Sequence, residues 1–338
     1  MKIQKVSLLQ QKVGRLFFVG LFVCAVLALT NPGIASSQNL SVAEQSSITG
    51  EWIVDFNRSK ADEVQLTLMR RTEGSNYMSS NGIGLDKLQG LSRDQAFGER
   101  KNVAFRIVRE AGTFECEGLF REGRGTGFWT LVPNQDFVSA MRGRGYDNLT
   151  QSNLFSAAVY DINIKLVEDL KAAGYNSLSF AELVKASIYR VTPEFIQGMK
   201  TAGYENLTLK QLVNARIYKV DGEFAKEVQE LGFELQPLKN LVNLRIYKVT
   251  PEFIRQIRSA GFDNITLGEL VNFRIYKVTP EFVREIKAEG FSSITPRDVV
   301  NLRIYKVDAD YIRRVKAKGY ADVTLKQLIN LRIYKIAE

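Results

Sequence analysis

The chain has 338 residues, of which 25% are charged, and a formal net charge of +9 without a single histidine. The absence of histidine excludes the Ser-His and Cys-His nucleophile systems and the common zinc ligand sets. Carboxylate-pair chemistry stays open in principle, but no carboxylates cluster outside the repeat pattern described below. We therefore expect a protein that is not an enzyme and that carries no cofactor and no metal.

Residues 1–35 have the pattern of a secretory signal peptide. Four basic residues precede an uncharged stretch at 16–29, and the small-residue site Gly33-Ile34-Ala35 follows. This stretch is shorter than the roughly 20 residues that span a bilayer as a helix, although an uncleaved membrane anchor is the alternative. We expect an exported protein, periplasmic or extracellular, with no membrane span after signal removal. Loss of four positive charges from +9 leaves +5, and Cys116 then has no partner for an intramolecular disulfide.

Residues 36–48 are polar and rich in turn formers, which predicts a flexible lead-in. From 49 to 131 short runs alternate in polarity, and this predicts a small antiparallel β domain. We expect its strands to curl into a partial barrel or sandwich with a filled core, a lipocalin-like pocket being the alternative. A polar, glycine-bearing insertion at 75–98 is expected to form a loop with one short helix. The alternating runs are 51–56, 63–68, 103–108, 113–120 and 127–131.

The rest of the chain is periodic, because a glycine and a tyrosine each recur every 29 residues. A fixed period of this size predicts an α-solenoid, in which each copy buries its apolar face against its neighbours. We expect seven 29-residue helical hairpins over residues 132–335 and a short tail at 336–338, so the fold class is an α+β multidomain protein. The periodic residues are Gly145, Gly174, Gly203, Gly232, Gly261, Gly290 and Gly319, and Tyr160, Tyr189, Tyr218, Tyr247, Tyr276, Tyr305 and Tyr334.

Each copy contains two helices separated by the periodic glycine. An N-cap residue such as Thr192 begins the first helix, and a capping box begins the second, except in the fourth copy, where Pro237 interrupts the box. The first helix is amphipathic and therefore expected on the outside. The second helix is apolar on two sides and is expected to line a concave inner face. One broad apolar arc of this helix comprises Leu209, Leu212, Val213, Ile217 and Val220.

A narrow polar strip on the second helix carries an asparagine and, one turn later, the periodic tyrosine. Asparagine offers donors and an acceptor to an extended backbone, and tyrosine adds a flat ring with a hydroxyl. We predict that this strip binds a protein or peptide partner. The alternative is that the asparagines bond neighbouring copies and the tyrosines pack in the seam between copies. The strip comprises Asn214, Tyr218, Asn243, Tyr247, Asn272, Tyr276, Asn301 and Tyr305.

An arginine lies among the apolar residues of the same helix, and a buried arginine requires a partner. An acid near the start of the first helix occurs in the same copies, which predicts structural salt bridges between the two sets. Binding of phosphate or carboxylate by the arginines is the alternative. The arginines are Arg216, Arg245, Arg274 and Arg303, and the acids are Glu194, Glu223, Glu252 and Glu281.

A further basic position ends each copy from the second onward. Because acids are interleaved with the bases in sequence, we expect only a solvated, faintly basic edge and no specific nucleic-acid binding. An acidic polymer such as an envelope glycan is the alternative to a protein partner. The basic residues are Arg190, Lys219, Lys248, Lys277, Lys306 and Lys335.

Three further motifs occur with these repeats. They are Thr113-Phe114-Glu115-Cys116-Glu117-Gly118, Gly125-Thr126-Gly127-Phe128, and Pro133-Asn134 leading into units such as Thr192-Pro193-Glu194-Phe195. Together they resemble the extracytoplasmic tails of certain bacterial BlaR-type sensor metallopeptidases, over roughly residues 49–335. Those proteins carry a membrane-embedded peptidase with a His-Glu-x-x-His zinc site, whereas this chain has no histidine. The resemblance implies an envelope-facing sensing or docking module without the protease activity.

Overall fold

The structure is a computed structural model that describes residues 47–56, 63–72 and 74–336. The predicted signal peptide at 1–35 and most of the predicted lead-in at 36–48 lie outside the described residues. Ile48, which the prediction placed at the end of the lead-in, is the first residue of a strand. Among the described residues, every helix is too short or too polar to span a bilayer.

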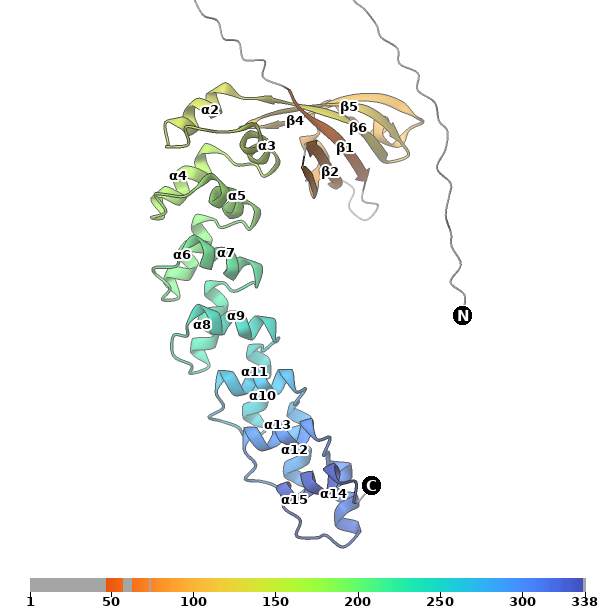
Figure 1. The fold of residues 1–338 in the computed structure, drawn as a ribbon, viewed down its shortest axis with the longest axis vertical. Helices are drawn as coiled ribbons and strands as arrows, with labels where there is room; N and C mark the ends of the chain where they lie inside the picture. Colours follow the sequence, from red (N-terminus) through yellow and green to blue (C-terminus); the bar gives the residue numbers. More distant parts are fainter. Residues whose placement is uncertain (1–46, 57–62, 73, 337–338) are drawn as a thin grey trace, which may run out of the picture. The chain divides into compact units, whose positions relative to one another are not determined.

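The first part of the described chain, residues 48–133, forms one antiparallel sheet of six strands (Figure 1). Its strand order is β3-β2-β1-β6-β5-β4, so β3 and β4 are the two edges of an open sheet. The sheet is therefore not a sandwich. The strands are β1 (Ile48–Phe56), β2 (Glu63–Thr72), β3 (Ser75–Gly84), β4 (Lys101–Arg109), β5 (Gly112–Arg121) and β6 (Arg124–Pro133).

Strand β3 corrects the prediction of a loop at 75–98. The segment Ser75–Gly84 pairs with β2 along its whole length, from Ser75 opposite Thr72 to Gly84 opposite Glu63. It lacks the apolar alternation of a strand because it is an edge strand rich in serine, asparagine and glycine. Only the end of the segment agrees with the prediction, as the short helices η1 (Leu85–Lys87) and α1 (Arg93–Phe97).

Tryptophan and phenylalanine rings fill the core on one face of the sheet. The Trp52 ring packs edge-to-face on Phe105 at 4.9 Å and stacks on Phe120 at 5.5 Å, measured between ring centroids. Its indole N–H donates to the carbonyls of Glu117 and Phe128 at 3.2 and 3.1 Å. A buried indole with its one donor satisfied belongs to a packed core. The filled interior therefore agrees with the predicted core and not with the alternative of a lipocalin-like pocket.

Fourteen helices follow the sheet, and α3 to α15 each have nine residues. Pairs in chain order define copies one to seven, each with a first helix of even number and a second helix of odd number. The helices are α2 (Gln135–Arg142), α3 (Gln151–Val159), α4 (Ile164–Ala172), α5 (Phe180–Ile188), α6 (Pro193–Thr201), α7 (Leu209–Ile217), α8 (Gly222–Glu230), α9 (Leu238–Ile246), α10 (Pro251–Ser259), α11 (Leu267–Ile275), α12 (Pro280–Ala288), α13 (Pro296–Ile304), α14 (Ala309–Ala317) and α15 (Leu325–Ile333).

The predicted caps are confirmed at both helices of a copy. The Thr192 hydroxyl accepts from the Phe195 amide at the start of α6, and Thr208 and Gln211 form a complete capping box on α7. Helix α9 departs as expected, since its N-cap residue Pro237 provides no side-chain bond. These local signals work because the first amides of a helix have no partner within the helix.

Contacts between helices join each copy to the next. The more extensive ones connect second helices to second helices, from α3 with α5 through α13 with α15, and first helices such as α10 with α12. Helices α6 and α8 approach most closely, because Gly198 and Gly222 meet where other copies have larger residues. A Cβ atom on Gly222 would lie 2.1 Å from the carbonyl oxygen of Gly198.

Candidate functional site: an exposed Ile–Tyr–Lys ladder

The end of every second helix from α5 onward exposes an isoleucine and a tyrosine. These isoleucines are 42–48% exposed and the tyrosines 38–42%, apart from Tyr334 at 72%. A lysine or arginine follows each tyrosine and is also exposed. We call this set the Ile–Tyr–Lys ladder, with six rungs: Ile188-Tyr189-Arg190, Ile217-Tyr218-Lys219, Ile246-Tyr247-Lys248, Ile275-Tyr276-Lys277, Ile304-Tyr305-Lys306 and Ile333-Tyr334-Lys335.

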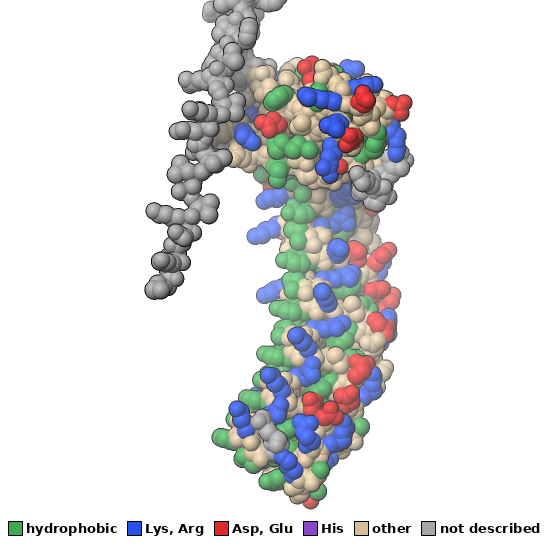
Figure 2. All heavy atoms as spheres, turned by 90° about the vertical axis from the view of Figure 1, so that its right-hand side faces the viewer, with side chains coloured by type: hydrophobic (Ala, Val, Ile, Leu, Met, Phe, Trp, Pro, Cys, Tyr) green, Lys and Arg blue, Asp and Glu red, His purple; other side chains and the backbone are tan. Residues whose placement is uncertain are grey.

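The ladder accounts for most of the exposed apolar surface of the helical region. Outside it, the large hydrophobic residues exposed between α2 and the end of the described chain are Leu235, Tyr320 and Ile336. Figure 2 shows a column of hydrophobic side chains along the helices, with Lys and Arg side chains beside it. Contiguous apolar surface bordered by charge is typical of an interaction site.

The exposed isoleucines correct one prediction. Ile217 was expected on the buried apolar arc of its helix, but its side chain is 46% exposed. The buried side of α7 consists of Leu209, Leu212, Val213 and Ala215, the last of which confirms the expectation of burial on two sides. Ile217 is the last residue of the helix, where the chain turns away, so a helical wheel does not describe its surroundings.

Each rung ends in a left-handed residue that is not glycine. Lys219 has φ of 56°, and its counterparts in the other rungs have φ between 52° and 56°. The Lys219 amide donates to Arg216 and the Val220 amide donates to Ala215, which is a Schellman cap. The first helices use glycine for the same cap, with φ of 95° at Gly203. A side chain at this position costs about 1–2 kcal/mol relative to glycine.

The arginine–glutamate salt bridges are corrected by the structure. Each of the four arginines lies over a phenylalanine ring, and none of the ion pairs found among the described residues includes these arginines. The predicted acids pair elsewhere where they pair at all, as Glu252 does with Arg255 and Glu281 with Arg284. The distances from guanidinium carbon to ring centroid are 4.6 Å for Arg216 on Phe195, 3.7 Å for Arg245 on Phe224, 3.7 Å for Arg274 on Phe253 and 4.7 Å for Arg303 on Phe282.

Arg216 also caps the preceding second helix. Its Nε donates to the carbonyl oxygens of Tyr189 and Arg190, at 3.1 and 2.9 Å. These carbonyls lie at the negative end of the α5 dipole, so the guanidinium supplies the cation that this end favours. The exposed side chain of Arg190 is therefore not needed as the cap of α5 and is available to another group.

Basic residues outnumber acids on the second helices. The second helices from α5 to α15 each carry one or two basic residues, and their carboxylates are Glu182, Glu269 and Asp298. Each of these carboxylates accepts hydrogen bonds within a capping box, and the bonds from Ser179 hold the pKa of Glu182 below its ordinary value. The first helices carry both signs, with two arginines beside Glu252 on α10 and three basic residues beside Asp310 on α14, and Figure 2 shows acidic side chains gathered away from the hydrophobic column. Exposed acids near the start of the first helices are Glu194, Glu223, Glu252, Glu281 and Asp310.

In copy one the sheet contacts the position of the rung. Tyr160, the counterpart of the ladder tyrosines, is half-buried and meets Tyr77 of β3 with ring centroids 6.3 Å apart. The next residue is Asp161 instead of a base, and Arg109 of β4 lies 3.7 Å from its carboxylate. An acid therefore replaces the base in the copy whose tyrosine contacts the sheet, although the Asp161 side chain itself stays 59% exposed.

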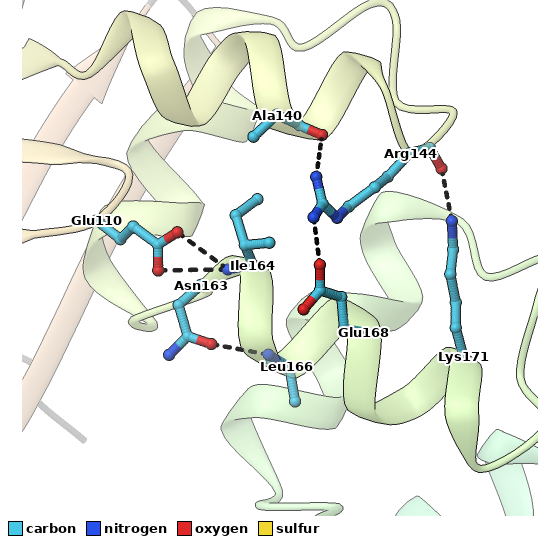
Figure 3. A network of polar contacts seen from close by, with 8 residues as sticks. All are labelled: Glu110, Ala140, Arg144, Asn163, Ile164, Leu166, Glu168 and Lys171. Atoms are coloured by element: carbon cyan, nitrogen blue, oxygen red, sulfur yellow. Dashed lines mark hydrogen bonds and ion pairs between the residues drawn. The ribbon is translucent and has the colours of Figure 1, made fainter.

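Polar contacts around the next copy join this region to the sheet (Figure 3). Glu110, in the turn between β4 and β5, accepts from the backbone amide of Ile164 at 3.3 Å through both carboxylate oxygens. Arg144 pairs with Glu168, and Lys171 donates to the backbone carbonyl of Arg144 at 2.9 Å. A carboxylate at the first turn of α4 is favourable against the helix dipole. These contacts connect copies one and two to each other and to the sheet.

The predicted asparagine strip lies one turn before the ladder. Asn214 and Asn272 are exposed, and Asn243 and Asn301 are half-buried. Their backbone carbonyls accept helical bonds, as Asn214 does from Tyr218, but none of the hydrogen bonds found among the described residues involves these four side chains. The structure therefore places Asn and Tyr of the predicted strip on one exposed side of α7 and shows no bond between copies through the asparagines.

Sequence reasoning did not assign the isoleucines and the final basic residues to the site. A local sequence signal could have identified them. A basic residue, not glycine, stands after the tyrosine at the end of the second helix and directly before a buried valine such as Val220 or Val249. A Schellman cap normally favours glycine at that point, so a repeated lysine there is itself informative.

Acidic residues outside the ladder are further candidates for metal binding or acid–base chemistry. No group of three or more Cys, Asp or Glu residues among the described residues could hold a metal ion. Asp169 and Glu194 line an open groove of about 460 Å³ between α4 and α6. Asp169 accepts from Lys165, and hydrogen bonding by Thr192 holds the pKa of Glu194 below its ordinary value.

Comparisons with protein-family models, with curated proteins and with solved structures found no match. The resemblance to BlaR-type sensor tails stays a prediction from sequence motifs.

Proposed function

We propose that the helical copies form an α-solenoid that acts as a non-enzymatic scaffold for protein or peptide segments, bound along the Ile–Tyr–Lys ladder. The exposed side chains of the ladder carry this proposal, since aromatic residues next to aliphatic ones supply much of the binding energy at protein interfaces when they lose solvent. The 29-residue spacing extends the same contact over consecutive copies.

The signal-peptide pattern and the BlaR-type motifs support an exported sensing or docking module as the setting of this scaffold. In this proposal the sheet anchors one end of the repeats, and the copies provide the binding surface. Enzymatic activity has no part in it.

A selection from a random library of displayed peptides tests the proposal with the purified protein as bait. Peptides that bind should lose affinity at least about tenfold for the variant Tyr247→Ala/Tyr276→Ala. The matched control is Tyr320→Ala, because Tyr320 is 45% exposed but lies outside the ladder. Binders that ignore the double variant, or a selection that yields no binders, would count against the scaffold.

The exposed basic residues of the rungs favour one second candidate, a scaffold for an acidic polymer such as an envelope glycan. Binding of this kind depends on the basic residues and weakens steeply with salt. Titration with a sulfated polysaccharide distinguishes it, because affinity should then fall in Lys277→Gln and stay unchanged in Tyr276→Ala.

A further inference from the structure

We infer that the ladder accepts an acidic peptide segment in the polyproline II conformation, with a carboxylate at every third residue. This inference rests on the proposed function and names the class of its partner. Three observations lead to it: the spacing of the copies, the charge of the rungs and the backbone conformation at each basic residue.

The first observation concerns spacing. Contacting helices pack about 8–10 Å apart, so consecutive second helices present one rung for roughly each such step. A polyproline II chain completes a turn in three residues and rises about 9 Å over that turn. The rise of one turn of the peptide therefore matches the distance between neighbouring rungs. Proline-rich segments also dock on aromatic surfaces in other recognition modules, and each rung offers one exposed tyrosine ring.

The second observation concerns charge. The six basic residues of the rungs take part in none of the ion pairs found among the described residues. The nearest carboxylates on the second helices are held in capping boxes, as Glu269 is by Thr266. In copy one, Asp161 replaces the base and meets Arg109 of the sheet. Copy one thus places an acid beside a base of the sheet, and by analogy we assign a negative charge to the occupant of the basic, open rungs.

The third observation concerns backbone strain. The φ of 56° at Lys248 and Lys277 favours glycine, which the first helices use at the matching turn. At the end of α5, where Arg190 has the same conformation, the helix end does not depend on the basic side chain, because Arg216 supplies the cation for the carbonyls of Tyr189 and Arg190. Glycine would form the same turn at lower cost, so we assign the exposed basic side chain of the rung to a carboxylate of the bound segment.

Defined peptides test the inference directly. A labelled peptide of six Pro-Glu-Leu units is titrated with the purified protein and followed by fluorescence anisotropy. Two controls are a Pro-Lys-Leu peptide, which reverses the charge, and a Pro-Glu-Leu-Ser peptide, which changes the period to four residues. We expect the Pro-Glu-Leu peptide to bind at least about tenfold more tightly than either control, with affinity that falls as salt rises.

Variants at the rungs give the second readout. Lys277→Gln should weaken the Pro-Glu-Leu peptide several-fold, whereas Lys226→Gln on the first-helix side should not. Lys277→Gly should raise the melting temperature, because glycine relieves the left-handed backbone, and should still weaken the peptide. A purely structural lysine cannot produce these two opposite changes.

Three results would overturn the inference: equal binding of the three-residue and four-residue peptides, unchanged affinity in Lys277→Gly, or binding of polyglutamate and a sulfated polysaccharide that matches the Pro-Glu-Leu peptide and ignores Tyr276→Ala. If library-selected peptides still require Tyr247 and Tyr276 in that case, the scaffold stands and only its partner class is wrong. If they do not, both proposals fail.

Discussion

At the scale of single residues, the arginines of the second helices show how a partly buried guanidinium can be stabilised without an acidic partner. The Arg216 guanidinium has a ring beneath it and two carbonyl oxygens at its Nε. Arg274 also lies on a ring, but its Nε is buried without a hydrogen-bond partner, and burial lowers the pKa of this guanidinium. The two positions are equivalent in sequence and differ in what they bond.

This difference gives a matched pair of variants. Arg216→Met should lower the free energy of unfolding by about 1–2 kcal/mol more than Arg274→Met, because only the first removes hydrogen bonds to a charged donor. Both variants lose a cation–π contact, which is worth about 0.5–1 kcal/mol at partly exposed sites. Chemical denaturation measures both; equal losses would show that the two bonds to the α5 end contribute nothing.

Residue-scale features were predictable where their cause is local. The N-caps, the capping boxes and the glycine turns depend on neighbours within a few positions, so Thr192 and Gly203 could be assigned from sequence. The partner of Arg216 could not, because it lies in the preceding copy and consists of backbone carbonyls that leave no sequence signal. The exposure of Ile217 depends in the same way on where neighbouring copies end.

At the scale of elements, nine-residue helices are too short to be stable alone in water. Their stability comes from packing against the same kind of helix in the next copy, and α6 with α8 is the tightest example. Gly222 begins α8 directly against the backbone of Gly198, whereas a Cβ atom on Gly198 would meet nothing within 4 Å.

The two glycines should therefore respond oppositely to alanine. Gly222→Ala forces a methyl group into the α6 backbone and should destabilise the protein by about 1–3 kcal/mol. Gly198→Ala should be neutral or stabilise by up to about 1 kcal/mol, because alanine favours the helix and has room. Thermal melting of both variants is the measurement, and a stable Gly222→Ala would mean that the helices can separate at little cost.

Element prediction failed at β3 for a physical reason. Strand patterns are read from apolar alternation, and an edge strand with one solvated side and residues such as Asn76 and Ser80 shows little of it. The segment becomes a strand because β2 offers it backbone hydrogen bonds along its whole length, and this pairing leaves no pattern in the sequence of the segment.

At the scale of the whole molecule, contacts between copies reach the neighbouring copy and scarcely beyond it. The free energy of unfolding of such a chain is approximately a sum of terms for the single copies and for the interfaces between them. A destabilising substitution in one copy should therefore have a local effect.

Leu328 of α15 is fully buried and provides the test. Leu328→Ala should remove about 2–5 kcal/mol locally and speed amide hydrogen exchange in α13 to α15, while β1 and β5 keep their protection. The control is Leu241→Ala in α9, which should speed exchange in the central copies. Uniform acceleration through the sheet would show that the chain unfolds as one unit.

Tyr77 contacts Tyr160, and Arg109 pairs with Asp161, so the sheet lies at the copy-one end of the ladder. On a row of identical rungs, a repetitive segment could bind in several registers that have the same binding free energy. Under the proposed function, the contacts between the sheet and copy one would end the row there, so that a bound segment would extend only toward α15. Two segments of equal composition would then differ in affinity according to the number of rungs that each can contact, counted from the end of the ladder at the sheet.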